Sequence, residues 1–380
     1  MIRTLCGPAR AVVSIAALLA IGCAACTSAI PGAATTTTTA APSGIVAVDD
    51  RMQRSEEWLA DFTQPNRPGC SAAAAVDGEV AWADAAGLAD LDAAAPLTTA
   101  TRFDLFGVSD QFVATAILLL AADGKLALND PLSAHVPDLP PWADRVTVEH
   151  LLHHTSGVPE IWSRIQAAGF LAAHPATQAD AMVLIRGVHE LNFEPGTFFE
   201  GNGSNYLLLA EVVQSASGQS LPDFFRDRLF APVQLDIDSS AQAAGDIAVN
   251  YAEVLGELQP DRSNGLLVNG PGLQYGTPTD LVRWAENYRT GSVGGPALLA
   301  AVEHGAVPIG PNPGGPSYGA GIFVRVDGSL EHGGWAPGEF SYFSVSPDRH
   351  TTVAIVCNHA GQGQGERMIQ GLRQIWFGIP

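Results

Sequence analysis

The sequence predicts an α/β protein with strands near both ends of the folded chain and helices between them. Near the start, Cys70–Val76 and Glu79–Asp84 flank the pair Asp77-Gly78, a pattern typical of a β-hairpin. In the middle, Gln111–Leu132 is nearly all apolar up to Asp123-Gly124, as expected of a buried central helix. In the last third, Tyr318–Val326, Leu330–Asp348 and Thr351–Asn358 indicate the remaining strands, and Thr279-Asp280 before them indicates the start of a helix.

Composition indicates a globular, acidic chain. Of the 380 residues, 47% are hydrophobic and 15% are charged, so the chain can bury one large core or two closely packed halves. The formal net charge is −20, which would repel a phosphate backbone. We therefore expect no nucleic-acid partner.

Residues 1–26 resemble a bacterial secretory signal, because Arg3 and Arg10 precede the apolar run Ala11–Ile21. This run is too short to span a bilayer comfortably. Cys23 follows Ala20-Ile21-Gly22, a layout that resembles a lipobox, in which the cysteine is lipidated. The sequence thus predicts an exported protein held at the membrane through Cys23, with cleavage by signal peptidase and secretion as the alternative.

A polar segment separates this signal from the folded domain. Residues 27–44 are rich in Thr, Ala and Pro and read as a flexible tether. The globular domain is expected over residues 45–380. Its first helix is predicted at Ile45–Phe62, and a last one at Gln364–Trp376.

The most informative stretch is T-R-F-D-L-F-G-V-S-D-Q-F-V-A, residues Thr101–Ala114. It resembles the superfamily of serine β-lactamases, D-alanyl-D-alanine carboxypeptidases and family VIII esterases, which reads T-x-F-x-x-G-S-x-S-K-x-F here. Gly107 stands at the position of the nucleophilic serine and Asp110 at that of the lysine. The only lysine is Lys125, and Ala122 lies three residues before it, so the chain contains no S-x-x-K in any register.

Of two further motifs of this superfamily, the first is altered in this chain and the second is retained. Pro195–Tyr206 resembles P-G-x-x-F-x-Y-S-N-x-x-Y, with Gly201 at the tyrosine and Gly203 at the asparagine. A slip of one residue would return Asn202 to the asparagine position, but no slip restores the tyrosine. His332 and Gly334 lie in a segment that resembles the K-T-G or H-x-G strand lining the pocket.

Other matches are expected to be structural. Thr147–Pro159 contains H-T-S-G, where we expect His153 and His154 to cap and pack a helix end rather than catalyse. Gly315–Gly319 spells G-x-S-x-G, but it lacks the strand before and the helix after that this motif requires, so we expect the entry to a strand.

The resemblance implies a β-lactamase/transpeptidase-like fold, with an antiparallel sheet flanked by helices. Residues 45–105 and 270–380 would form the α/β part, and residues 106–269 an inserted, mostly helical part. The first and last strands would then lie side by side. On that basis we predict a disulfide between Cys70 and Cys357, with two buried thiols as the alternative.

Function remains divided among three classes. The leading expectation is a pseudoenzyme of the cell envelope that binds a small molecule or an envelope component in a remnant pocket. The first alternative is a hydrolase with relocated catalytic residues, for which Ser109 is a candidate that should face away from the site. The second is a structural envelope protein. The expected pocket residues are Gly107, Asp110, Gly201, Gly203, His332 and Gly334.

The glycines at these positions are expected to enlarge the pocket and leave Asp110 and His332 as its polar contacts. A carboxylate about 4 Å from an ionised Asp110 would cost on the order of 4 kcal/mol at an effective dielectric of 20. Neutral or cationic ligands should therefore be preferred over carboxylate-bearing β-lactams. We expect no cofactor and no metal, because two ligands are too few for a metal site.

Overall fold

The computed structural model describes residues 48–170, 176–239, 246–260, 270, 272–312, 314–336 and 338–379. The predicted signal, Cys23 and the tether lie outside these residues. Val46–Pro380 forms one compact unit. Within the described part, no helix has the length and apolar character needed to cross a membrane.

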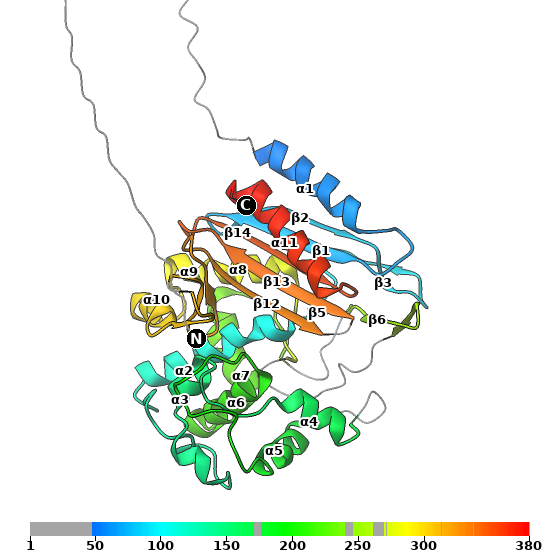
Figure 1. The fold of residues 1–380 in the computed structure, drawn as a ribbon. Coiled ribbons are helices and arrows are strands. Elements are labelled where there is room, and N and C mark those ends of the chain that lie inside the picture. Colours follow the sequence, from blue (N-terminus) through cyan, green and yellow to red (C-terminus); the bar gives the residue numbers. More distant parts are fainter. Residues whose placement is uncertain are drawn as a thin grey trace, which may run out of the picture. The chain divides into compact units, whose positions relative to one another are not determined.

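An eight-stranded antiparallel sheet joins the two ends of this unit (Figure 1), as the resemblance implied. Two strands come from the first part of the chain and six from its last third, so the helical part is inserted between them. In sheet order the strands are β2 (Glu79–Ala86), β1 (Cys70–Val76), β14 (Thr351–Cys357), β13 (Glu339–Val345), β12 (Leu330–Ala336), β11 (Phe323–Val324), β10 (Ser317–Tyr318) and β9 (Val307–Pro308).

Helices cover both faces of the sheet. The terminal helices α1 (Val48–Phe62) and α11 (Gln362–Phe377) pack together on one face, as Figure 1 shows, where Trp82, Ile355 and Leu372 belong to one buried apolar cluster. On the other face, α8 (Pro278–Ala285) packs against β1 and β14. A second and larger core joins this face to the helical part.

The helical part surrounds α2 (Asp110–Ala122), in which every residue from Asp110 to Leu120 is buried. The predicted helix ends at Ala122 because Gly124 turns the chain with φ 69°. The other helices of this part are η1 (Phe106–Ser109), η2 (Leu132–Ala134), η3 (Pro141–Asp144), α3 (Val148–Leu152), α4 (Ile161–Ala167), α5 (Gln178–Arg186), α6 (Gly203–Ser217), α7 (Leu221–Phe225), η4 (Arg226–Phe230) and η5 (Ala231–Val233).

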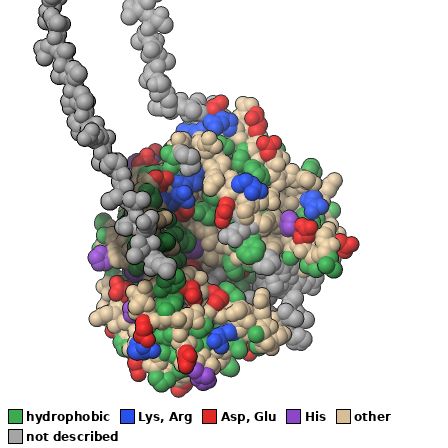
Figure 2. Space-filling view, in the orientation of Figure 1, with side chains coloured by type: hydrophobic (Ala, Val, Ile, Leu, Met, Phe, Trp, Pro, Cys, Tyr) green, Lys and Arg blue, Asp and Glu red, His purple; other side chains and the backbone are tan. Residues whose placement is uncertain are grey.

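Smaller elements complete the fold. In the part of the chain that the structure describes, three two-stranded sheets pair β3 (Leu88–Asp90) with β4 (Ala95–Pro96), β5 (Phe103–Asp104) with β8 (Tyr275–Gly276), and β6 (Tyr251–Val254) with β7 (Glu257–Pro260). The remaining helices are α9 (Asn287–Thr290) and α10 (Gly295–Glu303). On the face shown in Figure 2, acidic and basic side chains lie interspersed among uncharged ones.

Two expectations about element boundaries need correction. The strand predicted from Tyr318 to Val326 is two short strands, β10 and β11, because Gly321 adopts φ 71° between them. Helix α8 begins at Pro278 and not at Thr279: Thr277 is its N-cap and forms a capping box with Asp280.

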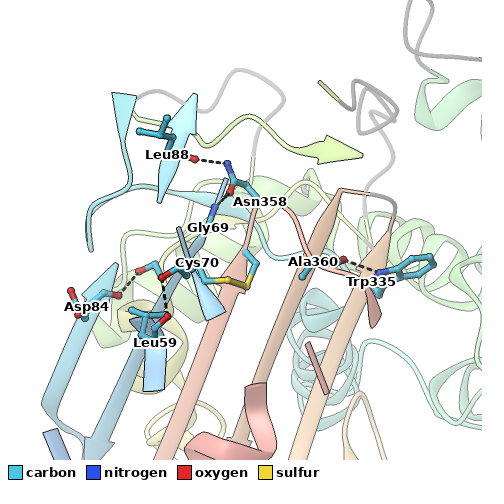
Figure 3. The surroundings of a disulfide bond; sticks show 11 residues. Leu59, Gly69, Cys70, Asp84, Leu88, Trp335, Asn358 and Ala360 are labelled. Atoms are coloured by element: carbon cyan, nitrogen blue, oxygen red, sulfur yellow. Dashed lines mark hydrogen bonds between the residues drawn. A yellow bond between two sulfur atoms is a disulfide. The ribbon is translucent and has the colours of Figure 1, made fainter. Parts of the chain in front are cut away.

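The disulfide between Cys70 and Cys357 is present where the sequence analysis expected it. These residues are partners in the antiparallel register of β1 and β14, with Cα atoms 4.0 Å apart. Figure 3 shows Asn358 beside this disulfide, accepting a hydrogen bond from Gly69 N and donating one to Leu88 O. The covalent link and this side chain together hold the two ends of the domain in one sheet.

Candidate functional site

The superfamily motifs meet where η1 and the start of α2 face β12. Asp110 opens α2, and His332 lies on β12 with its Nε2 atom 3.8 Å from Asp110 Oδ2. His154, which follows α3, has its Nε2 atom 3.8 Å from the same oxygen. One carboxyl group and two imidazoles thus converge from three separate elements.

Burial determines the charge of this cluster. The exposed fractions of Asp110, His154 and His332 are only 6%, 5% and 4%. Loss of hydration raises the pKa of Asp110 well above its usual range, and the charge of Glu160 raises it further. Loss of hydration also lowers the pKa of His154 to about 3 and that of His332 to about 4. At neutral pH the neutral forms of all three are therefore favoured, whereas the sequence analysis assumed an ionised Asp110.

Two buried tyrosines extend the cluster. The hydroxyl of Tyr318 lies 3.0 Å from His332 Nε2 and 3.3 Å from the hydroxyl of Tyr206. Tyr206 donates to Leu152 O at 2.9 Å. Asp110 Oδ1 has no hydrogen-bond partner among the residues that the structure describes. This oxygen is therefore a buried polar atom without a partner in the described part of the chain, close to both imidazoles.

The position of the family serine is occupied by backbone. A Cβ atom on Gly107 would lie 3.0 Å from Gly333 O and 3.1 Å from Gly334 Cα. A Cβ on Gly334 would lie 2.4 Å from Gly107 N. Strand β12 therefore packs directly on η1, and this contact depends on the absence of side chains at both positions.

The absence of a side chain at Gly203 likewise leaves no cavity. A Cβ on Gly203 would lie 2.7 Å from Trp162 Nε1, so the indole already fills that space. Trp162 also stacks on Phe106, with ring centroids 6.1 Å apart. Gly201 is exposed beside Phe199. The prediction that these glycines enlarge the pocket is therefore wrong, because neighbouring groups occupy the space beside Gly107 and Gly203.

A second carboxylate lies at this edge of the cluster. Glu160 accepts hydrogen bonds from Gly203 N at 2.9 Å and from Trp162 N at 3.1 Å. Loss of hydration raises its pKa. Glu160, Trp162, Phe106 and Gly203 are only partly buried, so they form the accessible side of the site.

The ring of His154, which was expected only to cap and pack a helix end, lies beside Asp110, with Nε2 3.8 Å from Oδ2. His153 does have the structural role, since it is the C-cap of α3. The available signal was the unusual His153-His154 pair before a glycine turn, but the helix end did not reveal which imidazole points inward.

The other candidate residues make different contacts. Ser109 is fully buried, and its Oγ atom has no hydrogen-bond partner within the described residues. Asn202 is the N-cap of α6 and donates to Val158 O. Ser317, the serine of the G-x-S-x-G stretch, begins β10 as expected. Within the described residues no group of three or more His, Cys, Asp or Glu side chains, the cluster of Asp110, His154 and His332 included, is arranged to hold a metal.

Comparison with known proteins gives matches over most of the domain. The Beta-lactamase family profile matches residues 47–374. A D-aminopeptidase of Cereibacter sphaeroides is 29% identical over 315 residues, covering 77% of this chain and 57% of that protein. A penicillin-binding protein of Bacillus subtilis is 30% identical over 163 residues, covering 43% of this chain and 36% of that protein. The chain thus spans just over half the length of the D-aminopeptidase.

Solved structures share the fold. The D-amino acid amidase of Ochrobactrum anthropi superposes with a TM-score of 0.73 at 22% identity, covering 86% of this chain and 98% of the amidase. A penicillin-binding protein of Bacillus halodurans gives the same TM-score and identity, covering 85% of this chain and 98% of that protein. These similarities extend over the sheet and the helical part alike.

The relatives correct the pseudoenzyme interpretation. Proteins that match in sequence include a D-aminopeptidase and a penicillin-binding protein, which favours the hydrolase alternative. The sequence interpretation rested on four missing side chains alone. It did not include the two imidazoles that lie 3.8 Å from Asp110 Oδ2.

Proposed function

The chain belongs to the Beta-lactamase family, and we propose that it is a hydrolase of amide or ester bonds whose catalytic groups have moved to Asp110, His154 and His332. The observation that supports this most directly is the approach of both imidazoles to one oxygen of Asp110, each at 3.8 Å. Carboxyl and imidazole groups together form a common general acid–base arrangement. The glycine at the serine position makes water the attacking group in this proposal.

The proposed reaction is a direct hydrolysis. Water attacks the acyl carbon, its proton passes to the pair of Asp110 and His332, and the same pair returns a proton to the leaving amine or alcohol. His154 stabilises the negative charge that develops at the carbonyl oxygen or at Asp110. No covalent acyl-enzyme is formed, in contrast to a serine mechanism.

We propose substrates that carry an amine rather than a carboxylate. Asp110 and Glu160 both lie at the site, and neither forms an ion pair with Lys or Arg in the described part of the chain. An incoming ammonium would favour their ionised forms, whereas a carboxylate would be left buried without a cation. The D-aminopeptidase named above is a relative consistent with this substrate class.

Hydrolysis of chromogenic substrates tests the proposal. Amino-acid p-nitroanilides and p-nitrophenyl esters would be assayed with the wild type, with Asp110→Asn and with Ser109→Ala. The near-isosteric Asp110→Asn should reduce kcat/KM roughly 10²- to 10⁴-fold, the usual contribution of general acid–base catalysis. Asp61→Asn, at an exposed position on α1, is the matched control.

Two results would overturn this assignment. One is a wild-type rate no faster than that of heat-denatured protein. The other is a rate that Ser109→Ala abolishes while Asp110→Asn leaves it intact, which would assign the chemistry to a serine. A penicillin or phosphonate adduct in the intact mass would also contradict direct attack by water.

We further propose that the protein is exported and anchored at the membrane through Cys23. The signal-like sequence of residues 1–26 supports export. The disulfide between Cys70 and Cys357 supports it independently, because disulfides persist in oxidising compartments. Detergent phase partitioning of the wild type and of Cys23→Ser in a bacterial host tests this. Soluble, unmodified protein that begins after Cys26 would contradict the anchor.

A further inference from the structure

The two ring nitrogens of His154 have different surroundings. Nδ1 lies 2.8 Å from Asn205 Nδ2 and 3.4 Å from Asn202 N. Both neighbouring atoms carry hydrogens, and a backbone N–H can only donate. Nδ1 must therefore be the unprotonated nitrogen, and a neutral His154 carries its proton on Nε2, the atom that faces Asp110 Oδ2 at 3.8 Å.

A short chain of hydrogen bonds fixes the orientation of the Asn205 amide. Val158 N donates to Ser156 Oγ at 3.0 Å, and Ser156 Oγ donates to Asn205 Oδ1 at 2.5 Å. The amide oxygen is thus committed to Ser156, which leaves the amide nitrogen directed at His154. Ser156 and Asn205 are both buried, with exposed fractions of 1% and 0%, so solvent does not compete for these bonds.

His332 is held in the opposite form. Its Nδ1 atom lies 3.1 Å from Gly333 O, and a carbonyl oxygen can only accept, so Nδ1 carries the proton. In a neutral His332 the lone pair is then on Nε2, which faces Asp110 Oδ2 at 3.8 Å and the Tyr318 hydroxyl at 3.0 Å. Burial raises the pKa of Tyr318 well above its usual range, so the hydroxyl keeps its one proton, for which His332 Nε2 at 3.0 Å and the Tyr206 oxygen at 3.3 Å compete.

We infer that Ser156 and Asn205 are positioning residues that hold His154 as the donor and thereby give the cluster around Asp110 a direction. His154 presents an N–H to one oxygen of Asp110, while His332 presents a lone pair to the same oxygen. His332 is consequently the proton acceptor of the site and His154 its charge-stabilising donor. The mechanistic consequence rests on the proposed hydrolase function, but the tautomer assignment does not.

Asn205→Asp tests the assignment with little change in shape. The introduced side chain, once ionised, would only accept, so it would draw the proton of His154 to Nδ1 and leave a lone pair on Nε2. NMR of protein labelled with ¹⁵N-histidine distinguishes the two tautomers directly, and His154→Gln assigns the signal. We expect Nε2–H at His154 in the wild type, Nδ1–H in Asn205→Asp, and Nδ1–H at His332 in both. Asn129→Asp, away from the cluster, is the matched control.

A second variant keeps the inference testable if Asn205→Asp does not fold. Ser156→Ala removes the donor to Asn205 Oδ1, so the amide loses its fixed orientation and both tautomers of His154 should be populated. In both variants kcat should fall roughly a hundredfold with little change in KM, because the acid–base geometry and not substrate binding is altered.

The outcomes separate this inference from the proposed function. Nδ1–H at His154 in the wild type, or Nε2–H retained in Asn205→Asp, would overturn the positioning role even if hydrolysis depends on Asp110. The expected tautomers in a protein without hydrolytic activity would support the positioning of His154 and overturn the proposed function instead.

Discussion

Gly107 and Gly334 are in backbone contact across the site, since a Cβ atom on Gly334 would lie 2.4 Å from Gly107 N. Gly107, at the family's serine position, therefore packs directly against the backbone of strand β12. A side chain at either position would push the strand away from η1. The backbone of β12 thus leaves little room for the family's serine side chain.

Restoring the family residue at this position should destabilise the protein. In Gly107→Ser the new Cβ would lie 3.0 Å from Gly333 O, so β12 must shift. We expect a loss of about 1–3 kcal/mol in the free energy of unfolding, measured by chemical denaturation, as for other overpacked sites. We also expect no penicillin adduct by intact mass, even combined with Asp110→Lys.

Gly310→Ser is the control for this prediction. A Cβ at Gly310 would meet no atom within 4 Å, so its effect should stay within about 0.5 kcal/mol. Equal stabilities of the Gly107→Ser and Gly310→Ser variants would contradict this prediction. Rapid acylation of the variant that combines Gly107→Ser with Asp110→Lys would also contradict it, because the site would then still accommodate the family's serine and lysine.

The space beside Gly203 should be coupled to Trp162. Gly203→Ala alone should cost about 1–3 kcal/mol, because its Cβ would lie 2.7 Å from Trp162 Nε1. In a Trp162→Ala background the same change should cost nothing or stabilise by up to about 1 kcal/mol, the helix preference of Ala over Gly. Chemical denaturation of the two single variants and the double variant gives the coupling free energy. Effects that add within about 0.5 kcal/mol would refute the contact.

Binding of an amine should release protons. Burial raises the pKa of Asp110 and that of Glu160, and a nearby ammonium would lower both. Isothermal titration calorimetry in buffers of different ionisation enthalpy should show proton release with phenylalaninamide and none with its N-acetylated, uncharged analogue. Asp110→Asn should diminish the release. Equal affinity for the two ligands, or tighter binding of a matched carboxylate, would contradict the proposed substrate class.

Asp104 should make the domain less stable as the pH rises. Burial raises its pKa to about 6, although hydrogen bonds from the backbone at Phe106, Leu273 and Gln274 lower it. Because the pKa is higher in the folded state, the folded protein binds this proton more tightly than the unfolded chain does. The resulting stabilisation is complete below the unfolded pKa of about 4 and is lost as pH rises through 6, amounting to about 3 kcal/mol.

Denaturation from about pH 4 to pH 7 tests this sign. The stability of the wild type relative to Asp104→Asn should fall by about 3 kcal/mol over that range. The exposed Asp61→Asn should show no such trend relative to the wild type. A difference between wild type and Asp104→Asn that is constant with pH, or rises with it, would contradict the buried carboxyl.

Local patterns in the sequence were enough for several features of the fold. The Asp77-Gly78 turn predicted the hairpin of β1 and β2, and the apolar run after Asp110 predicted α2. The absence of S-x-x-K is a property of the chain itself, since Lys125 is its only lysine. These features could be read in advance because turn conformation, helix periodicity and motif spacing depend on residues close together in the chain.

Resemblance to the superfamily supplied what local patterns could not, namely the sheet built from both ends of the chain and the adjacency of Cys70 and Cys357. Boundaries within the last third were less predictable. Gly321 breaks the expected strand between β10 and β11, because its positive φ depends on how the chain turns beside α2.

By itself, the sequence determined which side chains this protein lacks at the family positions; only the tertiary structure decided what took their place. The indole of Trp162 lies beside Gly203, the backbone of β12 covers Gly107, and His154 joins His332 at Asp110. Each contact joins residues from different elements, brought together by packing of the helical part against the sheet. The direction and burial of a side chain follow from that packing, so no motif spacing could distinguish an open pocket from a filled one.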